Sequence, residues 1–172
     1  MSQINITPGD ITTASVDVIV NAANPIMLGG GGVDGAIHKA AGSKLLEECR
    51  RVKATNGIRC PSGEARITSG CNLKAKFIIH TVGPRYKIEK TPEHCLASAY
   101  TNSLDLAVLN DCKSIAFPAI SCGVYGYPIQ EAAEIAISTC LKSKYKNLAI
   151  SFFLYNKSTF ECWIKALERL SA

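Results

Sequence analysis

The sequence of 172 residues has no long hydrophobic segment, although 47% of its residues are hydrophobic and only 19% are charged. No apolar run approaches the roughly 18 residues that are needed to cross a bilayer. The first residues, Met1 to Asn5, have neither the basic start nor the apolar core of a secretion signal. We therefore expect an intracellular, cytoplasmic protein that does not associate with membranes.

The sequence also lacks the spacings of a metal site. Its eight cysteines include no C-x-x-C pair, and His38, His80 and His94 do not pair with them at zinc-ligand spacings. So many cysteines in a small secreted chain would indicate disulfides, but a chain of this length buries about 70% of the surface of its unfolded form. We expect reduced, mostly buried cysteines, and neither a metal nor a cofactor.

Three common nucleotide-site and hydrolase patterns are missing or incomplete. Gly30, Gly32 and Gly35 fit G-x-G-x-x-G, but no second strand ending in an acid follows about 20 residues later, as a dinucleotide-binding unit requires. Residues 119–123 nearly match the G-x-S-x-G elbow of hydrolases around Ser121, but all three histidines precede that serine. No Gly-Lys-Ser or Gly-Lys-Thr occurs, which excludes a P-loop.

The charge of the chain suits an anionic ligand without indicating nucleic acid. The net charge is +5, and the basic residues form small groups such as 50–53 and 142–146 without interleaved aromatic residues. Nucleic-acid binding is therefore the less favoured alternative.

Four consecutive glycines, Gly29 to Gly32, are the most informative feature that is present. They lie between an apolar run ending at Asn24 and an amphipathic stretch that opens at Asp34. Glycines allow backbone N–H groups to approach a ligand closely, and the first turn of a following helix adds unpaired donors. A flexible linker is the alternative, but the run lacks the Ser and Thr of linkers, so we favour an anion-binding loop.

Strand-like and helix-like segments alternate along the whole chain. Apolar or β-branched strands are expected at 3–6, 16–22, 64–68, 76–82, 114–120 and 147–154. Helical periodicity covers 35–52, 93–110, 129–143 and 158–170, with start signals at Pro128 and at Ser158 or Thr159, and 53–62 is a loop. We predict one α/β domain over residues 1–172, a three-layer α/β/α architecture with a mixed, largely parallel sheet.

A second glycine-containing loop, 121–128, also follows an apolar strand and precedes a helix. Loops after the carboxyl ends of strands gather at one edge of such a sheet, so the two loops could hold a diphosphate between them. Gly123 and Gly126 could equally serve only to make the turn.

Six ordered blocks of the chain together resemble the macrodomain family, an ADP-ribose-binding fold, and within it the MacroD-type hydrolases. The blocks are Gly9 to Thr12, Val20 to Asn24, Gly29 to His38, Cys60 to Ala65, Ile79 to Pro84, and Phe117 to Pro128. The residues by themselves predict only an anion-binding α/β domain. The identity of the ligand comes from the resemblance.

The resemblance implies a role for each of several residues. Asp10, with the Ile11 backbone, would accept a hydrogen bond from the adenine amino group, and Tyr155 would pack on adenine or be an ordinary aromatic residue at a strand end. The backbone of two loops would hold the diphosphate and distal ribose; these residues are Gly31, Gly32 and Val33, with Ser121, Cys122, Gly123, Val124 and Tyr125. Cys122 stands where relatives often carry Thr, which leaves the backbone N–H in place.

Asn24 and Asp34 match the pair on which the family's hydrolase activity depends. Asn24 would orient the distal ribose, and Asp34 would position or deprotonate a water beside ribose C1″ or an ester on the ribose. From position alone, Asp34 fits a helix N-cap better, and both roles could coexist. His38, one turn later, could tune Asp34, although a histidine on this apolar face is more often a core residue, and we leave it out of the site.

The resemblance therefore implies an enzyme that removes mono-ADP-ribose from acidic side chains of proteins and deacetylates O-acetyl-ADP-ribose. ADP-ribose, its derivatives and ADP-ribosylated proteins would be its partners, and we expect a monomer. A non-catalytic ADP-ribose reader is the alternative. A regulatory role toward a ribonuclease is a third possibility, with no independent support in the sequence, and fold alone cannot choose among them.

Overall fold

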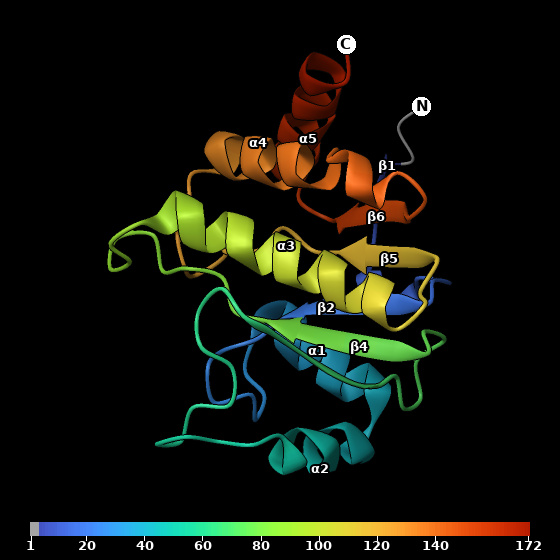
Figure 1. The fold of residues 1–172 in the computed structure, drawn as a ribbon, viewed down its shortest axis with the longest axis vertical. Helices are drawn as coiled ribbons and strands as arrows, with labels where there is room; N and C mark the ends of the chain where they lie inside the picture. The colour runs from blue at the N-terminus through green and yellow to red at the C-terminus, as the bar shows by residue number, and fades with distance from the viewer. Residues whose placement is uncertain (1–3) are drawn as a thin grey trace.

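The computed structural model describes residues 4–172, which form a six-stranded sheet between two layers of helices (Figure 1). The strands are β1 (Ile4–Pro8), β2 (Val18–Ala22), β3 (Ala65–Ser69), β4 (Phe77–Thr81), β5 (Ser114–Phe117) and β6 (Ala149–Leu154). All six expected strands are present; residue 3, the start of the first, lies outside the described residues.

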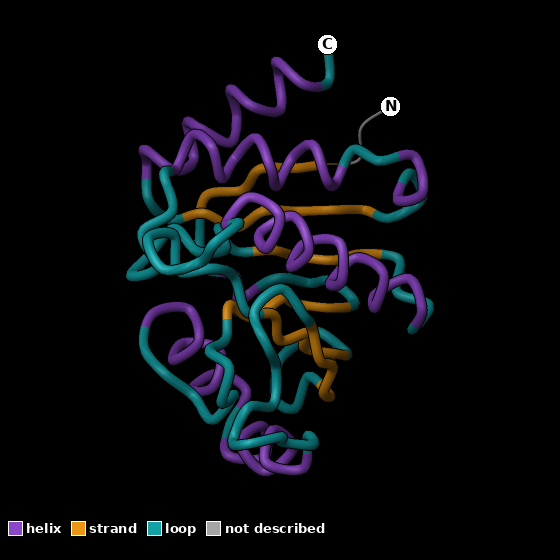
Figure 2. Tube along the Cα trace, turned by 60° about the vertical axis from the view of Figure 1, so that its left-hand side comes forward, coloured by secondary structure: helices purple, strands orange, loops and turns teal. Residues whose placement is uncertain are grey.

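The strand order β1-β6-β5-β2-β4-β3 brings the two glycine-containing loops together. β3 pairs antiparallel with β4, and every other neighbouring pair is parallel, so the predicted mixed, largely parallel sheet is confirmed. β2 and β5 are neighbours, and the chain leaves them toward helices on opposite faces of the sheet. A crevice opens where adjacent parallel strands diverge in this way, and Figure 2 shows loops gathered at that edge.

The helices divide between the two faces. α1 (Gly32–Ala41), α2 (Ser43–Arg51) and the short 3₁₀ helix η1 (Ile11–Thr13) cover one face, and α3 (Pro92–Leu109), α4 (Ile129–Cys140) and α5 (Lys157–Leu170) cover the other. In Figure 1, α3 crosses in front of the sheet and α1 lies behind it. Each layer buries its own hydrophobic cluster against the sheet: Val33 and Ile37 belong to the α1 side, and Ile120 and Tyr127 to the α3–α4 side.

Strand β2 contributes to both clusters and carries one polar residue in its interior. Val18 and Val20 face the α3–α4 cluster, whereas Ile19 faces the α1 cluster. Since successive side chains of a strand point to opposite faces, Asn21 shares the face of Ile19 and is completely buried. A buried amide needs hydrogen-bond partners, and these lie under α1.

Three predicted helix boundaries are wrong. The single helix expected over 35–52 breaks at Gly42, whose φ of 88° interrupts α1 and α2. α4 ends at Cys140 and is followed by the 3₁₀ turn η2 (Ser143–Tyr145). α5 is capped by Asn156, whose side-chain oxygen accepts from the backbone N–H groups of Ser158 and Thr159, so neither of those residues is the cap.

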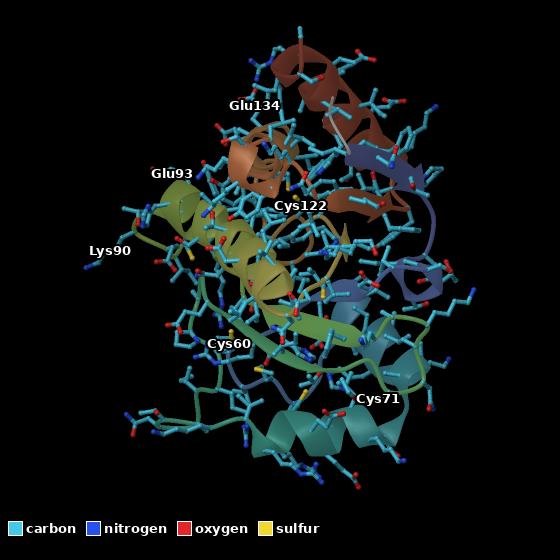
Figure 3. All side chains as sticks on the ribbon, turned by 45° about the vertical axis from the view of Figure 1, so that its right-hand side comes forward. Cys60, Cys71, Lys90, Glu93, Cys122 and Glu134 are labelled. Atoms are coloured by element: carbon cyan, nitrogen blue, oxygen red, sulfur yellow. The ribbon has the colours of Figure 1, made fainter. Side chains whose placement is uncertain are left out.

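The cysteines are free thiols spread through the fold. Five of the eight are buried and all eight are unpaired in residues 4–172, as expected. Cys60, Cys71 and Cys122, labelled in Figure 3, come from separate parts of the molecule. No helix in the described part of the chain combines the length and apolar character of a membrane span.

Candidate functional site

A cleft of about 670 Å³ lies at the carboxyl edge of the sheet. Its walls are the segment after β2 with the start of α1, the loop after β5, and the segment from the end of β6 into α5. The predicted site residues in its lining are Asn24, Gly31, Gly32, Val33, Asp34, Ser121, Cys122, Gly123, Val124, Tyr125 and Tyr155. The structure thus brings eleven of the thirteen predicted residues to one cavity.

The first wall is the glycine loop, which ends as the start of α1. Gly29 and Gly32 have φ values of 95° and 58°, conformations that favour glycine. Gly31 is the N-cap and has no side chain to satisfy the first turn, so the N–H groups of Gly32 and Val33 have no acceptor within residues 4–172. Unused donors at a helix N-terminus make a site for an anion.

The glycine loop is packed directly onto the helix that it precedes. A Cβ atom at Gly35 would lie 2.7 Å from the carbonyl oxygen of Gly30, closer than real side chains approach. Only glycine at position 35 therefore allows the loop to lie this close to α1. This contact sets how far the Gly30 backbone lies from the helix.

The second wall, 121–126, is held by its own hydrogen bonds. Ser121, at φ 67°, donates its hydroxyl to the carbonyl of Pro84 over 2.8 Å, and the Tyr127 N–H donates to the Ser121 carbonyl. Gly126 has φ 69° and closes the turn by donating to the Gly123 carbonyl. Gly126 thus makes the turn, while Gly123 faces the cleft.

Backbone donors of this second wall are also unused. The N–H groups of Gly123, Val124 and Tyr125 have no acceptor among residues 4–172. The two walls therefore present sets of free N–H groups to one cavity, as expected for a loop pair that holds a diphosphate.

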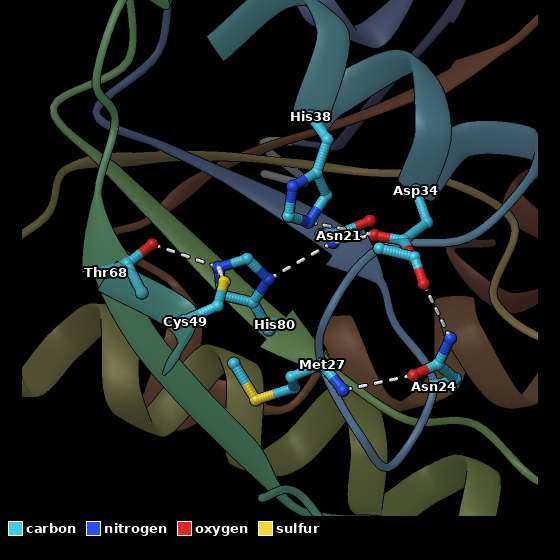
Figure 4. Close-up of polar contacts among 9 residues, drawn as sticks. Asn21, Asn24, Met27, Asp34, His38, Cys49, Thr68 and His80 are labelled. Atoms are coloured by element: carbon cyan, nitrogen blue, oxygen red, sulfur yellow. Dashed lines mark hydrogen bonds and ion pairs between the residues drawn. The ribbon is translucent and has the colours of Figure 1, made fainter. Parts of the chain in front are cut away.

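Asn24 fastens the loop between β2 and the glycines. Its side-chain oxygen accepts from the Met27 N–H at 3.0 Å, and its amide donates to the Gly29 carbonyl at 3.1 Å. The residue still lines the cleft, close to Asp34. Figure 4 shows the hydrogen bond from the Met27 N–H to the Asn24 side chain.

Asp34 is the one acidic residue in the lining of this cleft. It is the third residue of α1, so the alternative that it is the N-cap is wrong, because Gly31 occupies that position. The residue is only 5% exposed, and its carboxylate Oδ1 accepts from the Asn21 amide at 2.8 Å and lies 3.4 Å from His38 Nε2 (Figure 4).

Burial decides the ionisation of Asp34. Desolvation raises the pKa of this carboxyl above its ordinary value, and the Asn21 hydrogen bond and the nearby His38 oppose that rise. Sequence reasoning left both partners out of the site. The signals were a polar residue inside the buried run of β2 and a histidine four residues after Asp34 in a helix.

Asp10 and Ile11 are the predicted site residues that do not line the cleft. The Asp10 carboxylate accepts from the N–H and hydroxyl of Thr12 and caps η1, and Ile11 is buried beneath it. The Gly9 N–H donates to the Leu154 carbonyl, which places this segment beside the end of β6. An adenine contact at Asp10 stays a prediction.

The far end of the cleft is formed by β6 and the residues after it. Tyr155 is 83% exposed there, and Phe153 and Asn156, which sequence reasoning missed, also line it. Among the described residues no group of three or more His, Cys, Asp or Glu side chains could hold a metal ion. The functional groups in the lining include one buried carboxylate, backbone donors, the Asn24 amide and an aromatic rim.

Comparisons with known proteins agree with this geometry. The family model described as Macro domain matches residues 20–136. A macro domain-containing protein of Vibrio parahaemolyticus is 56% identical, with 98% of this chain and 99% of that protein covered. A Citrobacter rodentium protein named O-acetyl-ADP-ribose deacetylase is 58% identical over 139 residues, which cover 80% of this chain and 78% of that one.

Solved structures match equally well. The Oceanobacillus iheyensis macrodomain with ADP superposes with a TM-score of 0.91 at 45% identity, covering 96% of this chain and 90% of that one. The Trypanosoma brucei macrodomain in complex with ADP-ribose gives 0.83 at 36% identity, with 96% and 69% covered. From the matched family model and from relatives that cover almost its full length, the chain belongs to the macro domain family.

Proposed function

We propose that the protein binds ADP-ribose in this cleft and hydrolyses esters on its distal ribose. The observation that carries the proposal is the position of Asp34, a buried carboxylate that lines the same cavity as the free N–H groups of both loops. The Citrobacter rodentium relative named O-acetyl-ADP-ribose deacetylase and the neighbours bound to ADP and ADP-ribose support the choice of ligand.

Each part of the cleft has a chemical task in this proposal. The N–H groups at Gly32 and Val33 and at Gly123 to Tyr125 bind the diphosphate, helped by the start of α1. The aromatic end at Phe153 and Tyr155 receives the adenine. This direction of binding brings the distal ribose to Asn24 and Asp34.

Asp34 acts as the general base. It takes a proton from a water whose oxygen attacks the carbonyl carbon of the acetyl ester; the bond from that carbon to the ribose oxygen then breaks, and the proton passes to the ribose. Acetate and ADP-ribose are the products. A carboxyl whose pKa is raised by burial is a stronger base than an exposed one, and Asn24 orients the ribose hydroxyls.

The same arrangement would release ADP-ribose from a modified acidic side chain of a protein, where the ester joins a Glu or Asp carboxyl to the ribose. We also propose that the protein acts as a monomer in the cytoplasm. A reader that binds without turnover would need only the backbone donors and the adenine end.

The test compares the wild type with Asp34→Ala and with Glu47→Ala, which removes an exposed carboxylate from α2. Each protein is incubated with O-acetyl-ADP-ribose and with a glutamate-linked ADP-ribosylated protein, and ADP-ribose affinity is measured in parallel. We expect Asp34→Ala to lose turnover and Glu47→Ala to keep it. Binding without release by the wild type would favour the reader, and full activity of Asp34→Ala would refute the role of Asp34.

A further inference from the structure

A buried chain of hydrogen bonds runs from Asp34 away from the cleft and ends in β3 (Figure 4). The Asn21 amide nitrogen lies 2.8 Å from Asp34 Oδ1 and 3.2 Å from His80 Nδ1. His80 Nε2 lies 3.0 Å from the Thr68 hydroxyl. Asn21 and His80 are paired residues of the neighbouring strands β2 and β4, with exposures of 0% and 1%.

One tautomer of His80 satisfies every hydrogen bond in this chain. An amide has two N–H groups, and the Asn21 amide has one acceptor for each, Asp34 and His80 Nδ1. In this tautomer Nδ1 carries no hydrogen and accepts from Asn21, and Nε2 is protonated and donates to the Thr68 hydroxyl. That hydroxyl donates in turn to the Ser69 carbonyl at 3.2 Å.

Only the neutral form of His80 fits this arrangement. A hydrogen on Nδ1 would point at the N–H of Asn21, and burial lowers the pKa of His80 to about 3. His80 is therefore uncharged near neutral pH.

Within residues 4–172 the Asn21 side chain has hydrogen-bond partners only in Asp34 and His80. Its side-chain oxygen is buried and has no hydrogen-bond partner among residues 4–172. If the amide turned over, that oxygen would face the Asp34 carboxylate, which is also an acceptor. His80 could donate to the oxygen only by moving its hydrogen to Nδ1, and the Thr68 hydroxyl would then have to leave the Ser69 carbonyl to donate to Nε2. The Thr68 anchor of His80 thus makes the reversed amide unfavourable.

We propose that His80, held in place by Thr68, is a positioning residue for Asp34. It locks the Asn21 amide so that one N–H always points at Oδ1 of the carboxylate. The other carboxylate oxygen, Oδ2, then faces Gly30, which lines the cleft. A Cβ atom placed on Gly30 would lie 3.0 Å from Oδ2. The inference rests on the proposed role of Asp34 as base.

Other ionisable groups surround this chain and must be considered in any pH experiment. They are His38 from α1, Glu48 and Cys49 from α2, and Cys60 from the loop before β3. Burial raises the pKa of both thiols to about 11, so they are uncharged near neutral pH. His38 and Glu48 are unchanged in every variant compared, so a difference between the pH profiles of the variants does not come from these two residues.

The matched pair of variants is His80→Leu and His80→Asn. The two side chains have nearly the same size, but only asparagine offers an oxygen close to the position of Nδ1. We expect His80→Leu to lower kcat for O-acetyl-ADP-ribose roughly tenfold or more, the equivalent of one hydrogen bond to a charged group. ADP-ribose affinity should stay within about twofold, because the diphosphate loops are untouched. His80→Asn should return kcat to within about threefold of the wild type.

The pH profile separates positioning from general destabilisation. The Asn21 hydrogen bond lowers the pKa of Asp34, so its loss in His80→Leu raises that pKa. Activity requires the carboxylate and is lost as pH falls through this pKa; the acidic limb of the kcat profile should therefore move to higher pH in His80→Leu and not in His80→Asn. A merely structural role for His80 would lower Tm without moving this limb.

Thr68→Val keeps the test valid if His80→Leu does not fold. Valine has the shape of threonine but cannot accept from Nε2, so the imidazole loses its anchor. We expect a smaller shift of the acidic limb in the same direction. The Asp34 carboxyl pKa, read by ¹³C NMR titration, provides a measurement that does not depend on turnover.

The outcomes distinguish the two proposals. A shifted Asp34 titration in Thr68→Val, with no turnover by the wild type, would support positioning and refute the hydrolase. Wild-type kcat and an unmoved acidic limb in His80→Leu would overturn the positioning role, as would His80→Asn being as slow as His80→Leu.

Discussion

Replacing Gly35 by alanine tests whether the activity depends on the close packing of the Gly30 backbone against α1. The new Cβ would lie 2.7 Å from the Gly30 carbonyl oxygen and ordinary contact begins near 3.4 Å, so the carbonyl must retreat by roughly 0.7 Å. The Gly30 segment lies against Asp34 and Asn24, so its displacement moves the first wall relative to the Asp34 carboxylate.

The expected effects on stability and activity differ in size. Overpacking costs about 1 to 3 kcal/mol, and alanine in a helix is favoured over glycine by about 1 kcal/mol. The free energy of unfolding should therefore fall by only about 0 to 2 kcal/mol. A misplacement approaching 1 Å can cost up to about a hundredfold in rate, so kcat/KM for O-acetyl-ADP-ribose should fall about 10- to 100-fold.

The matched control is Ala36→Gly, at the exposed position that follows in α1. It reverses the exchange of alanine for glycine without creating a contact, so it should cost about 1 kcal/mol of stability and leave activity unchanged. Chemical denaturation and steady-state kinetics measure both quantities. Wild-type affinity and turnover in Gly35→Ala would show that the packing of Gly30 onto α1 does not set the geometry of the site.

Three further predictions follow from the described contacts. Ser121→Ala removes the hydroxyl that donates to the Pro84 carbonyl, so thermal unfolding should report a loss of about 1 kcal/mol and calorimetry a weaker affinity for ADP-ribose. Burial raises the pKa of Asp34 above 3.8, so the folded protein loses stability as pH rises through that raised pKa; denaturation at several pH values should show Asp34→Asn gaining on the wild type toward neutral pH, and a constant difference would refute this. Desolvation raises the pKa of Cys122 to about 12, so mass spectrometry should find this thiol almost unalkylated near neutral pH under conditions that modify free cysteine; rapid labelling of Cys122 would contradict the raised pKa.

The sequence predicts the strands better than the helix boundaries, for physical reasons. β2 and β5 are short apolar runs bounded by polar or turn residues, and such runs are recognisable locally. The break at Gly42 is not, because helical periodicity continues on both sides of it. Gly42 has a left-handed φ at the break, and there the Asn72 N–H donates to the Ala41 carbonyl, a contact that is tertiary.

The candidate site shows the same division. Asn24, Asp34 and the glycine loop could be predicted because they lie within one short stretch of sequence. Asn21 and His38 are also local, but the significance of each depends on contact with Asp34 across 13 and 4 residues. His80 and Thr68 join the site only through the pairing of β2, β4 and β3, which no local pattern encodes.

The division of the interior into two hydrophobic clusters has a consequence for local unfolding of the protein. The first wall of the cleft is anchored through Val33 in the cluster under α1, and the second through Ile120 and Tyr127 in the cluster under α3 and α4. A ligand that contacts both walls therefore links two hydrophobic clusters that could otherwise unfold locally and independently. Its binding energy would then be shared by both cooperative units, and amide hydrogen exchange should slow in both together.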